Sequence, residues 1–490
     1  MINLVLLIKT LLICCIIGVS PLWSQDCHSY INYKKDYDKA LICQEAMVRD
    51  LNYLYETILK THPTPFVYCS KEEFDVAYNS ALASVGSPKT VFEFAQIVAS
   101  FVKVIRDSHT SFNPRDLLFL SGKKRKLLPF YVMKFNERYY LSRIYTNEIP
   151  VGSELLFIGN MSVDSLYRLT RTFCPNEAMT ESSTREIIPK MMGNVFNAQN
   201  HSADETLRFI YVDNKGDTVR KELSYIKLKQ FDKKGKWYPS KEIEYEFIQD
   251  VGYLRIFSFE TKNEKRFKKE INRFFEKVKE VSCTDVVIDV RENRGGYVLL
   301  LEHLLSYISV DKTSYDLIYT YKRSDLDRFE TLSKFKKMDF VKKAKRVYPR
   351  GMISKEYDFY KSSKGSVNSI LYEKSLVYSN KSNYRGKCTL FMNGLSMSAS
   401  VLLASWFEET NRGDIVGSPC FGTLSGTNGN PATIFLKHSG LPVSISTLKL
   451  TPKAYQKTEG KDLSVDKLIS LSLEDLKEGI DPFKMTLIRD

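Results

Sequence analysis

Several features that define other classes of protein are missing from this chain of 490 residues. Its nine cysteines include no C-x-x-C pair and no cysteine–histidine spacing of a zinc site, so the sequence indicates no metal. The phosphate-binding patterns G-x-x-x-x-G-K-[ST] and G-x-G-x-x-G are both missing, and nothing implies a cofactor. Beyond the N-terminus no apolar run reaches the about 18 residues of a membrane-spanning helix.

The net charge of +14 is concentrated in one segment of the chain. Residues 311–386 contain 18 Lys and Arg against 9 Asp and Glu, which accounts for +9 of the +14. The rest is close to balanced, so the charge does not favour nucleic acid as a partner. We interpret this basic insertion as a lid, a contact in a homo-oligomer or a solvated surface, of which the last is the commonest in proteins.

The N-terminus resembles a secretory signal peptide over residues 1–24. Lys9 precedes an apolar run, and the small residue Ser24 offers a cleavage point. We therefore expect export to the periplasm, the cell surface or the medium, with an uncleaved membrane anchor as the alternative. Cleavage would leave seven cysteines, an odd number, and Cys27 with Cys43 is a candidate disulfide.

The rest of the chain divides into regions by its hydrophobic pattern. Apolar residues make up 43%, and the length suggests about three domains. Residues 25–126 form a helical region, with helices expected over 44–62, 70–83 and 90–107. Residues 127–229 carry short alternating strands and resemble a PDZ domain around Gly152, Ile158 and Asn160, whereas Ser153 departs from that pattern. From residue 240 to 490, buried strands alternate with helices, which predicts an α/β layered core.

Three local patterns could carry chemistry. In IDVRENRGG a strand runs into Gly295 and Gly296, where backbone N–H groups can approach a ligand closely. In TLFMNGLSMSAS a strand leads to a helix whose N-terminus lies near Ser398, where a developing anion is favoured, although Ser396 and Ser400 are alternatives. In RDSHTSF, His109 follows a helix.

Together these patterns resemble the C-terminal processing, or tail-specific, serine peptidases, whose core has the crotonase-like fold. The family turn D-[LV]-R-x-N-x-G-G is matched at 289–296, and its S-x-S-x-S segment at 396–400 with Ser398 as the nucleophile. The family strand VG-x-P-x-FG is matched at 416–422. The three matches extend over roughly 130 residues of the catalytic core and do not cover the helical region.

One departure from the family pattern selects the mechanism. Many members use a Ser–Lys dyad with Lys directly after FG, where this chain has Thr423. The resemblance then points to the branch similar to the tricorn protease core, which uses a serine, a histidine and a late carboxylate. His109 is the expected general base, with His438 as a competitor. Glu459 is the expected carboxylate, and Asp462 is its alternative.

The resemblance therefore implies an exported serine peptidase that acts on polypeptide substrates. His109 would take the proton of Ser398, and the N–H groups of Ala399 and of Gly295 or Gly296 would bind the oxyanion. A PDZ-like domain would hold an extended peptide by strand addition. The alternative is a catalytically inactive peptide-binding protein of the same fold.

Overall fold

The computed structural model describes residues 40–120, 126–144, 148–178, 182–200, 205–227, 241–310, 315–326, 362–373, 383–458 and 460–488. The expected signal peptide, Cys27, Glu459 and much of the basic insertion lie outside these residues. Cys43 is disulfide-bonded. Free, buried thiols are found at Cys69, Cys174, Cys283, Cys388 and Cys420. No described helix has both the length and the apolar character needed to cross a membrane.

The predicted N-terminal helices are present as α3 (Gln44–Thr61), α4 (Lys71–Ser84) and α5 (Val91–Lys103). The predicted capping box of Ser70 and Glu73 opens α4, and its two reciprocal hydrogen bonds satisfy N–H groups of the first turn. Helix α5 ends four residues earlier than the expected limit of 107, because the chain turns into a loop in which Arg106 has a φ of 55°. A short helix, α6 (Pro114–Leu120), follows this loop.

Residues 130–224 contain the predicted alternating strands. They form a sheet in the order β4–β5–β6–β8–β9, with β7 paired to β6. The strand bounds are β4 Phe130–Phe135, β5 Arg138–Ile144, β6 Glu154–Ile158, β7 Met161–Ser162, β8 Thr206–Val212 and β9 Thr218–Ser224. The insert between β7 and β8 folds into α7 (Val163–Phe173) and α8 (Ser182–Gln199).

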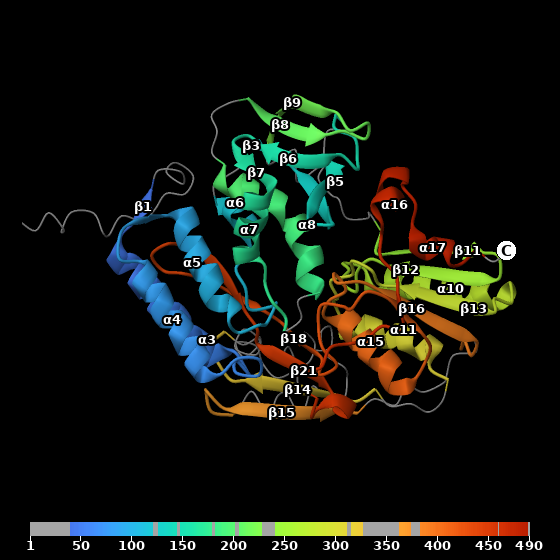
Figure 1. Ribbon diagram of the computed structural model, residues 1–490. Helices are drawn as coiled ribbons and strands as arrows, with labels where there is room; N and C mark the ends of the chain where they lie inside the picture. Colours follow the sequence, from blue (N-terminus) through green and yellow to red (C-terminus); the bar gives the residue numbers. More distant parts are fainter. Residues whose placement is uncertain are drawn as a thin grey trace, which may run out of the picture.

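One hydrophobic core joins this sheet to the N-terminal helices. Buried side chains of α3, α5, β4 and β8 belong to a single cluster, together with those of the hairpin β19 (Ala432–Phe435) and β20 (Pro442–Ile445). Figure 1 shows the blue helices beside the green sheet. The β19–β20 hairpin, in the orange-red part of the colour scale, extends to these helices. A segment from the C-terminal third of the chain therefore packs against the N-terminal helices.

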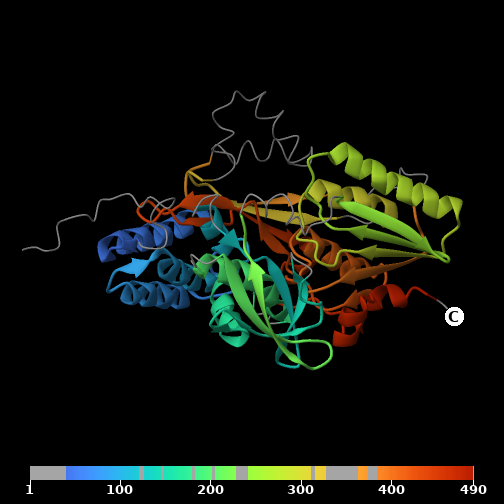
Figure 2. The ribbon, with the colours of Figure 1, turned by 90° about the horizontal axis from the view of Figure 1, so that it is seen from above.

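The C-terminal half contains the predicted α/β core. Its six-stranded sheet has the order β11–β12–β13–β16–β17–β22, and all neighbours are parallel except β11 and β12. The bounds are β11 Ile243–Ile248, β12 Val251–Ile256, β13 Asp285–Asp289, β16 Lys387–Met392, β17 Ile415–Gly417 and β22 Lys467–Leu468. Helices α10 (Glu264–Glu280), α11 (Val298–Ile308) and α15 (Ala399–Thr410) connect the parallel strands and share their main core. A smaller cluster on the opposite face includes α17 (Pro482–Met485), and Figure 2 shows α10 and the red C-terminal helices on opposite sides of this sheet.

A second, antiparallel sheet has the order β15–β14–β21–β18. Its bounds are β14 Leu317–Lys322, β15 Val367–Tyr372, β18 Thr427–Gly429 and β21 Leu448–Pro452. Strands β14 and β15 come from the described parts of the basic insertion, and Leu317, Tyr319 and Tyr321 of β14 are buried in the main core. The expectation of a solvated surface is therefore wrong for this strand, because its alternate apolar side chains complete the core.

Shorter elements complete the description: β1 Leu41–Ile42, β2 Lys89–Thr90, β3 Lys126–Leu127, β10 Ile226–Lys227, the 3-10 helix Lys453–Tyr455 and α16 Leu473–Glu478.

Candidate active site

Two of the three chemical patterns meet at one edge of the six-stranded sheet. Strands β13 and β16 are parallel neighbours, so the turns after them start at the same edge, where ligands bind in open α/β sheets. The backbone N–H of Met397 donates to the carbonyl oxygen of Asn293 at 2.9 Å. The N–H of Glu292 donates to Asn393 Oδ1, also at 2.9 Å. These bonds hold the glycine-rich turn against the serine-rich turn.

Ser398 has a strained backbone at the start of α15. Its φ is 54° and its ψ is −116°, a combination that L-residues adopt at a cost. It is the N-cap residue of α15, yet its side chain makes no capping hydrogen bond. The helix N-terminus places partial positive charge close to this hydroxyl. The strained turn therefore places the hydroxyl near the helix N-terminus, where it does not form a capping hydrogen bond.

The two neighbouring serines differ from Ser398 in their hydrogen bonds. Ser396 Oγ donates to the carbonyl of Val290 at 2.8 Å, and Ser400 Oγ donates to the carbonyl of Asn293 at 3.1 Å. Both are completely buried. Among the residues that the structure describes, Ser398 Oγ has no hydrogen-bond partner, and Ser398 is only partly buried. Ser396 and Ser400 thus tie the two turns together, which leaves Ser398 as the hydroxyl available for chemistry.

The glycines of the first turn allow the backbone of the two turns to touch. A Cβ added at Gly295, whose φ is 92°, would lie 2.5 Å from Ser398 Cβ and 2.8 Å from the nitrogen of Ala399. A Cβ at Gly296 would lie 2.1 Å from the backbone carbon of Phe259. A side chain at Gly295 would push the two turns apart, and one at Gly296 would push the glycine-rich turn away from the segment after β12.

The N–H groups expected to bind the oxyanion differ in whether they already donate a hydrogen bond within the chain. The N–H of Gly295 donates to Asn293 Oδ1 at 2.8 Å. Within the described part of the chain, the N–H groups of Gly296 and Ala399 have no acceptor, and that of Ala399 is one of the unsatisfied donors of the first turn of α15. Gly296 and Ala399 are therefore better placed than Gly295 to donate to a bound anion.

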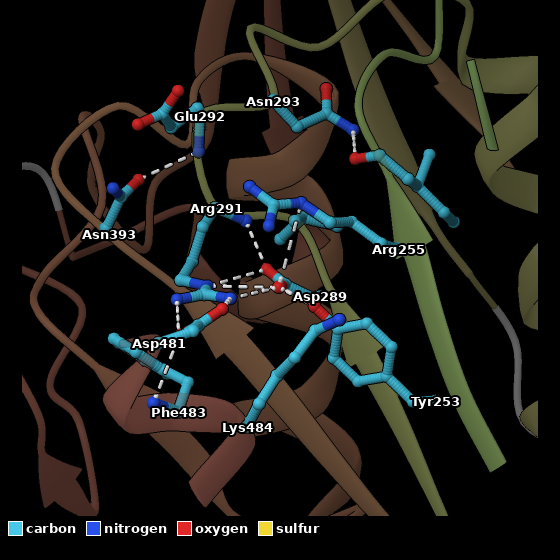
Figure 3. Close-up of polar contacts among 12 residues, drawn as sticks. Tyr253, Arg255, Asp289, Arg291, Glu292, Asn293, Asn393, Asp481, Phe483 and Lys484 are labelled. Atoms are coloured by element: carbon cyan, nitrogen blue, oxygen red, sulfur yellow. Dashed lines mark hydrogen bonds and ion pairs between the residues drawn. The ribbon is translucent and has the colours of Figure 1, made fainter. Parts of the chain in front are cut away.

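A buried ion-pair network supports the glycine-rich turn from below. The Arg291 side chain donates to both carboxylate oxygens of Asp289, and its Nη1 and Nη2 donate to Asp481 at 2.9 and 2.8 Å. Its guanidinium also lies 4.0 Å from the centre of the Phe483 ring. Figure 3 shows Arg291 between the two carboxylates, with Tyr253 donating to Asp289 from the neighbouring strand. The C-terminal segment around α17 is thereby fixed to the strand that leads into the turn.

Helix α8 supports the same two turns from the other side. Glu186 Oε1 accepts the N–H of Gly394 at 3.2 Å and the hydroxyl of Ser418 at 2.6 Å. Lys190 forms an ion pair with Glu292. Burial raises the pKa of Glu186, although its hydrogen bonds oppose that shift. Nothing in the local sequence marks these residues, because each contact joins segments more than 100 residues apart.

His109 lies in the loop after α5, in a cluster with two carboxylates. Its backbone N–H donates to Asp107 Oδ1 at 2.9 Å, and its Nδ1 lies 3.7 Å from the same oxygen. Glu177 Oε2 accepts the N–H of Ser108 at 2.8 Å. Burial would lower the pKa of His109, but its contact with Asp107 and the charges of Asp107 and Glu177 raise it above its ordinary value. Burial and the nearby Asp107 raise the pKa of Glu177.

One donor atom from each of Asp107, His109 and Glu177 lies within 4.8 Å of the others. Such a set can hold a metal ion in principle. Here, however, both oxygens of Asp107 already accept hydrogen bonds from the surrounding loop and from Ser446. The cluster is thus arranged to hold a histidine in place.

The other predicted site residues differ in where they lie. His109 and Ser398 form no hydrogen bond with each other, and Glu459 lies outside the described residues. Asp462 is exposed, and its backbone pairs with Thr423. His438 lies at the turn of the β19–β20 hairpin, where its N–H donates to Asp50 of α3 at 2.9 Å. The other end of β20 is the one that approaches the Asp107 loop, so His438 is not part of the His109 cluster.

Thr423, which stands where many family members have the lysine of a Ser–Lys dyad, has a buried hydroxyl. Thr423 is completely buried, and its Oγ1 lies 2.8 Å from Ser425 Oγ and 3.3 Å from the hydroxyl of Tyr68. Lys449, which is 5% exposed, donates to the same Tyr68 hydroxyl at 3.1 Å. Thr423 itself cannot act as a base at neutral pH.

Comparison with known proteins gives first the class and then the family. The two turns lie within residues 250–468, which match the model of peptidase family S41. The chain is a serine-type peptidase. The match assigns these residues to peptidase family S41. No curated protein sequence matches the chain.

Solved structures have a similar fold. A mutant of CPAF is 14% identical, with a TM-score of 0.64 over 89% of this chain and 94% of that one. Mature CPAF complexed with lactacystin is also 14% identical, with a TM-score of 0.61 over 89% and 95% of the two chains. The photosystem II D1 C-terminal processing protease is 11% identical, with a TM-score of 0.42 over 88% and 96%. The two CPAF structures support the fold over 89% of the chain.

Proposed function

We propose that this protein hydrolyses peptide bonds of polypeptide substrates through an acyl-enzyme on Ser398. The observation that carries the proposal is the contrast among the three serines of one turn. The hydroxyls of Ser396 and Ser400 donate hydrogen bonds to backbone carbonyls. Ser398 instead has a strained backbone, and its hydroxyl lies at a helix N-terminus without a hydrogen-bond partner among the described residues. A nucleophile needs this combination of access and nearby positive potential.

His109 is the proposed general base, with Glu459 as the carboxylate of the triad and Asp462 as its alternative. His109 accepts the proton of Ser398 as Oγ attacks the carbonyl carbon, and returns it to the leaving amine. Water then attacks the acyl-enzyme by the same route. The N–H groups of Ala399 and Gly296 bind the oxyanion, and each such donor is typically worth about 3 kcal/mol.

The remaining assignments describe the setting of this site. The α/β core from residue 240 onward is a crotonase-like catalytic domain, residues 25–126 are a helical region, and residues 127–229 are a PDZ-like domain. A cavity of about 1100 Å³, lined by residues of β6, β8 and α8, supports peptide binding in that domain. The chain is exported by a signal peptide at 1–24, and it processes the carboxyl-terminal regions of proteins.

Hydrolysis of an unfolded polypeptide such as casein tests this function. The wild-type chain should release peptides, and both Ser398→Ala and His109→Asn should reduce the rate to background. Ser396→Ala is the matched control, because it removes a hydroxyl from the same turn that only bonds the backbone. Hydrolysis by Ser398→Ala at the wild-type rate would overturn the proposal. A folded wild-type chain with no hydrolysis would instead favour the inactive peptide-binding protein.

A further inference from the structure

The loop that carries His109 is built around the carboxylate of Asp107, whose side chain is 1% exposed. Its Oδ2 accepts the hydroxyls of Thr110 at 2.7 Å and of Ser446 at 2.5 Å. Its Oδ1 accepts the backbone N–H of His109 at 2.9 Å. Burial would raise the pKa of Asp107, but its contacts with His109 and His62 hold it well below its ordinary value. A buried, ionised carboxylate therefore lies directly behind the proposed base.

The orientation of the His109 ring follows from this arrangement. Nδ1 lies 3.7 Å from Asp107 Oδ1 and 3.4 Å from Ser108 Oγ, so this nitrogen faces its own loop. The side chain of His109 is 18% exposed, against 1% for Asp107. With Nδ1 turned toward the carboxylate, Nε2 is the nitrogen left to exchange a proton with a substrate or a nucleophile.

A second buried histidine, His62, contacts the carboxylate of Asp107 without neutralising it. His62 Nε2 lies 3.0 Å from Asp107 Oδ2, and both side chains are 1% exposed. The backbone N–H of Thr64 donates to His62 Nδ1 at 3.1 Å. A nitrogen that accepts an N–H carries no proton, so Nε2 bears the hydrogen and donates it to Asp107. His62 is therefore a neutral donor, and the negative charge of Asp107 remains uncompensated from that side.

We propose that Asp107 and His62 are positioning residues for the peptide hydrolysis that we assign to Ser398 and His109. Asp107 holds the His109 backbone with Nδ1 turned inward, in addition to the triad carboxylate, and its charge stabilises the imidazolium that forms when Nε2 takes the Ser398 proton. Asp107 itself stays ionised throughout, and Nε2 later returns the proton to the leaving amine. His62 acts through Asp107, by holding its Oδ2 without neutralising it. The inference rests on the proposed function of His109.

The pH dependence of hydrolysis reports this role. His109 accepts a proton only in its neutral form, so the acid limb of kcat/KM follows its pKa. The groups whose charges act on His109 are Asp107 and Glu177, which raise this pKa, and Lys449, which lowers it. Removal of the Asp107 charge makes the imidazolium less stable. The acid limb must then move to lower pH, an effect that a purely structural role would not produce.

The test measures kcat/KM on a fluorogenic peptide between pH 4 and 9 for full-length variants whose unfolding temperatures are also recorded. Asp107→Asn should lower kcat/KM by about 10²- to 10⁴-fold and move the acid limb to lower pH. His62→Leu should lower kcat/KM to a smaller degree, because Asp107 loses the donor that holds its Oδ2. His62→Gln, whose amide N–H can replace Nε2–H, should restore most of the loss.

The outcomes separate this inference from the proposed function. An Asp107→Asn variant that folds and keeps the wild-type acid limb would overturn the role of Asp107. If Asp107→Asn does not fold, the His62 pair decides, and equal profiles for His62→Leu and His62→Gln would overturn it. A shift in Glu459→Gln without one in Asp107→Asn would assign the orientation of His109 to Glu459. Full activity of Ser398→Ala would instead contradict the proposed function itself.

Discussion

Replacement of Gly295 by alanine perturbs the candidate nucleophile directly. The added Cβ would lie 2.5 Å from Ser398 Cβ and 2.8 Å from both the nitrogen of Ala399 and the carbonyl oxygen of Met397. Since carbon atoms pack at about 3.5–4.0 Å, the turns must separate by about 1 Å. A displacement of that size at reacting groups costs about 10²-fold in rate. We therefore expect kcat/KM of Gly295→Ala to fall by about two orders of magnitude.

Gly216 provides a matched control for this substitution. Both glycines have a φ of 92°, so alanine at either position must adopt a positive φ, at a cost of about 1–2 kcal/mol. A Cβ at Gly216, in the turn between β8 and β9, meets nothing within 4 Å. Hydrolysis of a fluorogenic peptide and the unfolding temperature are measured for both variants. Equal activity of Gly295→Ala and Gly216→Ala, with both folded, would refute the claim that the two turns position Ser398.

Three further predictions concern groups around the site. The acid limb of wild-type kcat/KM should have its midpoint above pH 6.5, because the pKa of His109 is raised from that ordinary value and only neutral His109 accepts a proton; a midpoint below 6 would contradict this. Asp481→Asn should destabilise the fold by about 2 kcal/mol at pH 7, less than the about 3–5 kcal/mol of a fully buried pair because Asp481 is 29% exposed. Burial raises the pKa of Asp481, but Arg291 outweighs it and lowers this pKa overall, so the ion pair stabilises the fold at neutral pH. Denaturant unfolding should show that the wild-type chain and Asp481→Asn become equally stable as the pH falls through the pKa of Asp481. Glu186→Ala should lower kcat/KM about tenfold with little change in KM, since the turn after β16 loses its anchor, and an unchanged kcat would contradict that role.

Much of the α/β core could be predicted from the sequence, because its signals are local. Buried strands at 285–289 and 387–392, each followed by small residues and an apolar helix, indicated an α/β layered core. The capping box at Ser70 likewise depends on residues three apart, and it is present. A buried strand within the basic insertion was missed for the opposite reason. The net charge of the insertion obscured the alternation of Leu317, Tyr319 and Tyr321, which are buried in the main core.

Several features of the site have no local signal. The contacts of Glu186, Lys190 and Asp481 with the glycine-rich and serine-rich turns join distant segments, and isolated charged residues of this kind usually face solvent. The positive φ of Ser398 has no local signal either, because serine itself disfavours that conformation and the surrounding structure must hold it. The local pattern alone left three candidate serines, and the resemblance to the family pointed to Ser398. The hydrogen bonds of the folded chain distinguish Ser398 from Ser396 and Ser400.

The central claim is that Ser398 is the nucleophile of a serine peptidase. Its most direct test is to treat the folded wild-type chain with a fluorophosphonate probe and to locate the adduct by peptide mass spectrometry. The account predicts one adduct, on Ser398, whose formation slows in His109→Asn and disappears in Ser398→Ala. An adduct on Ser396 or Ser400, or labelling that persists in Ser398→Ala, would contradict it.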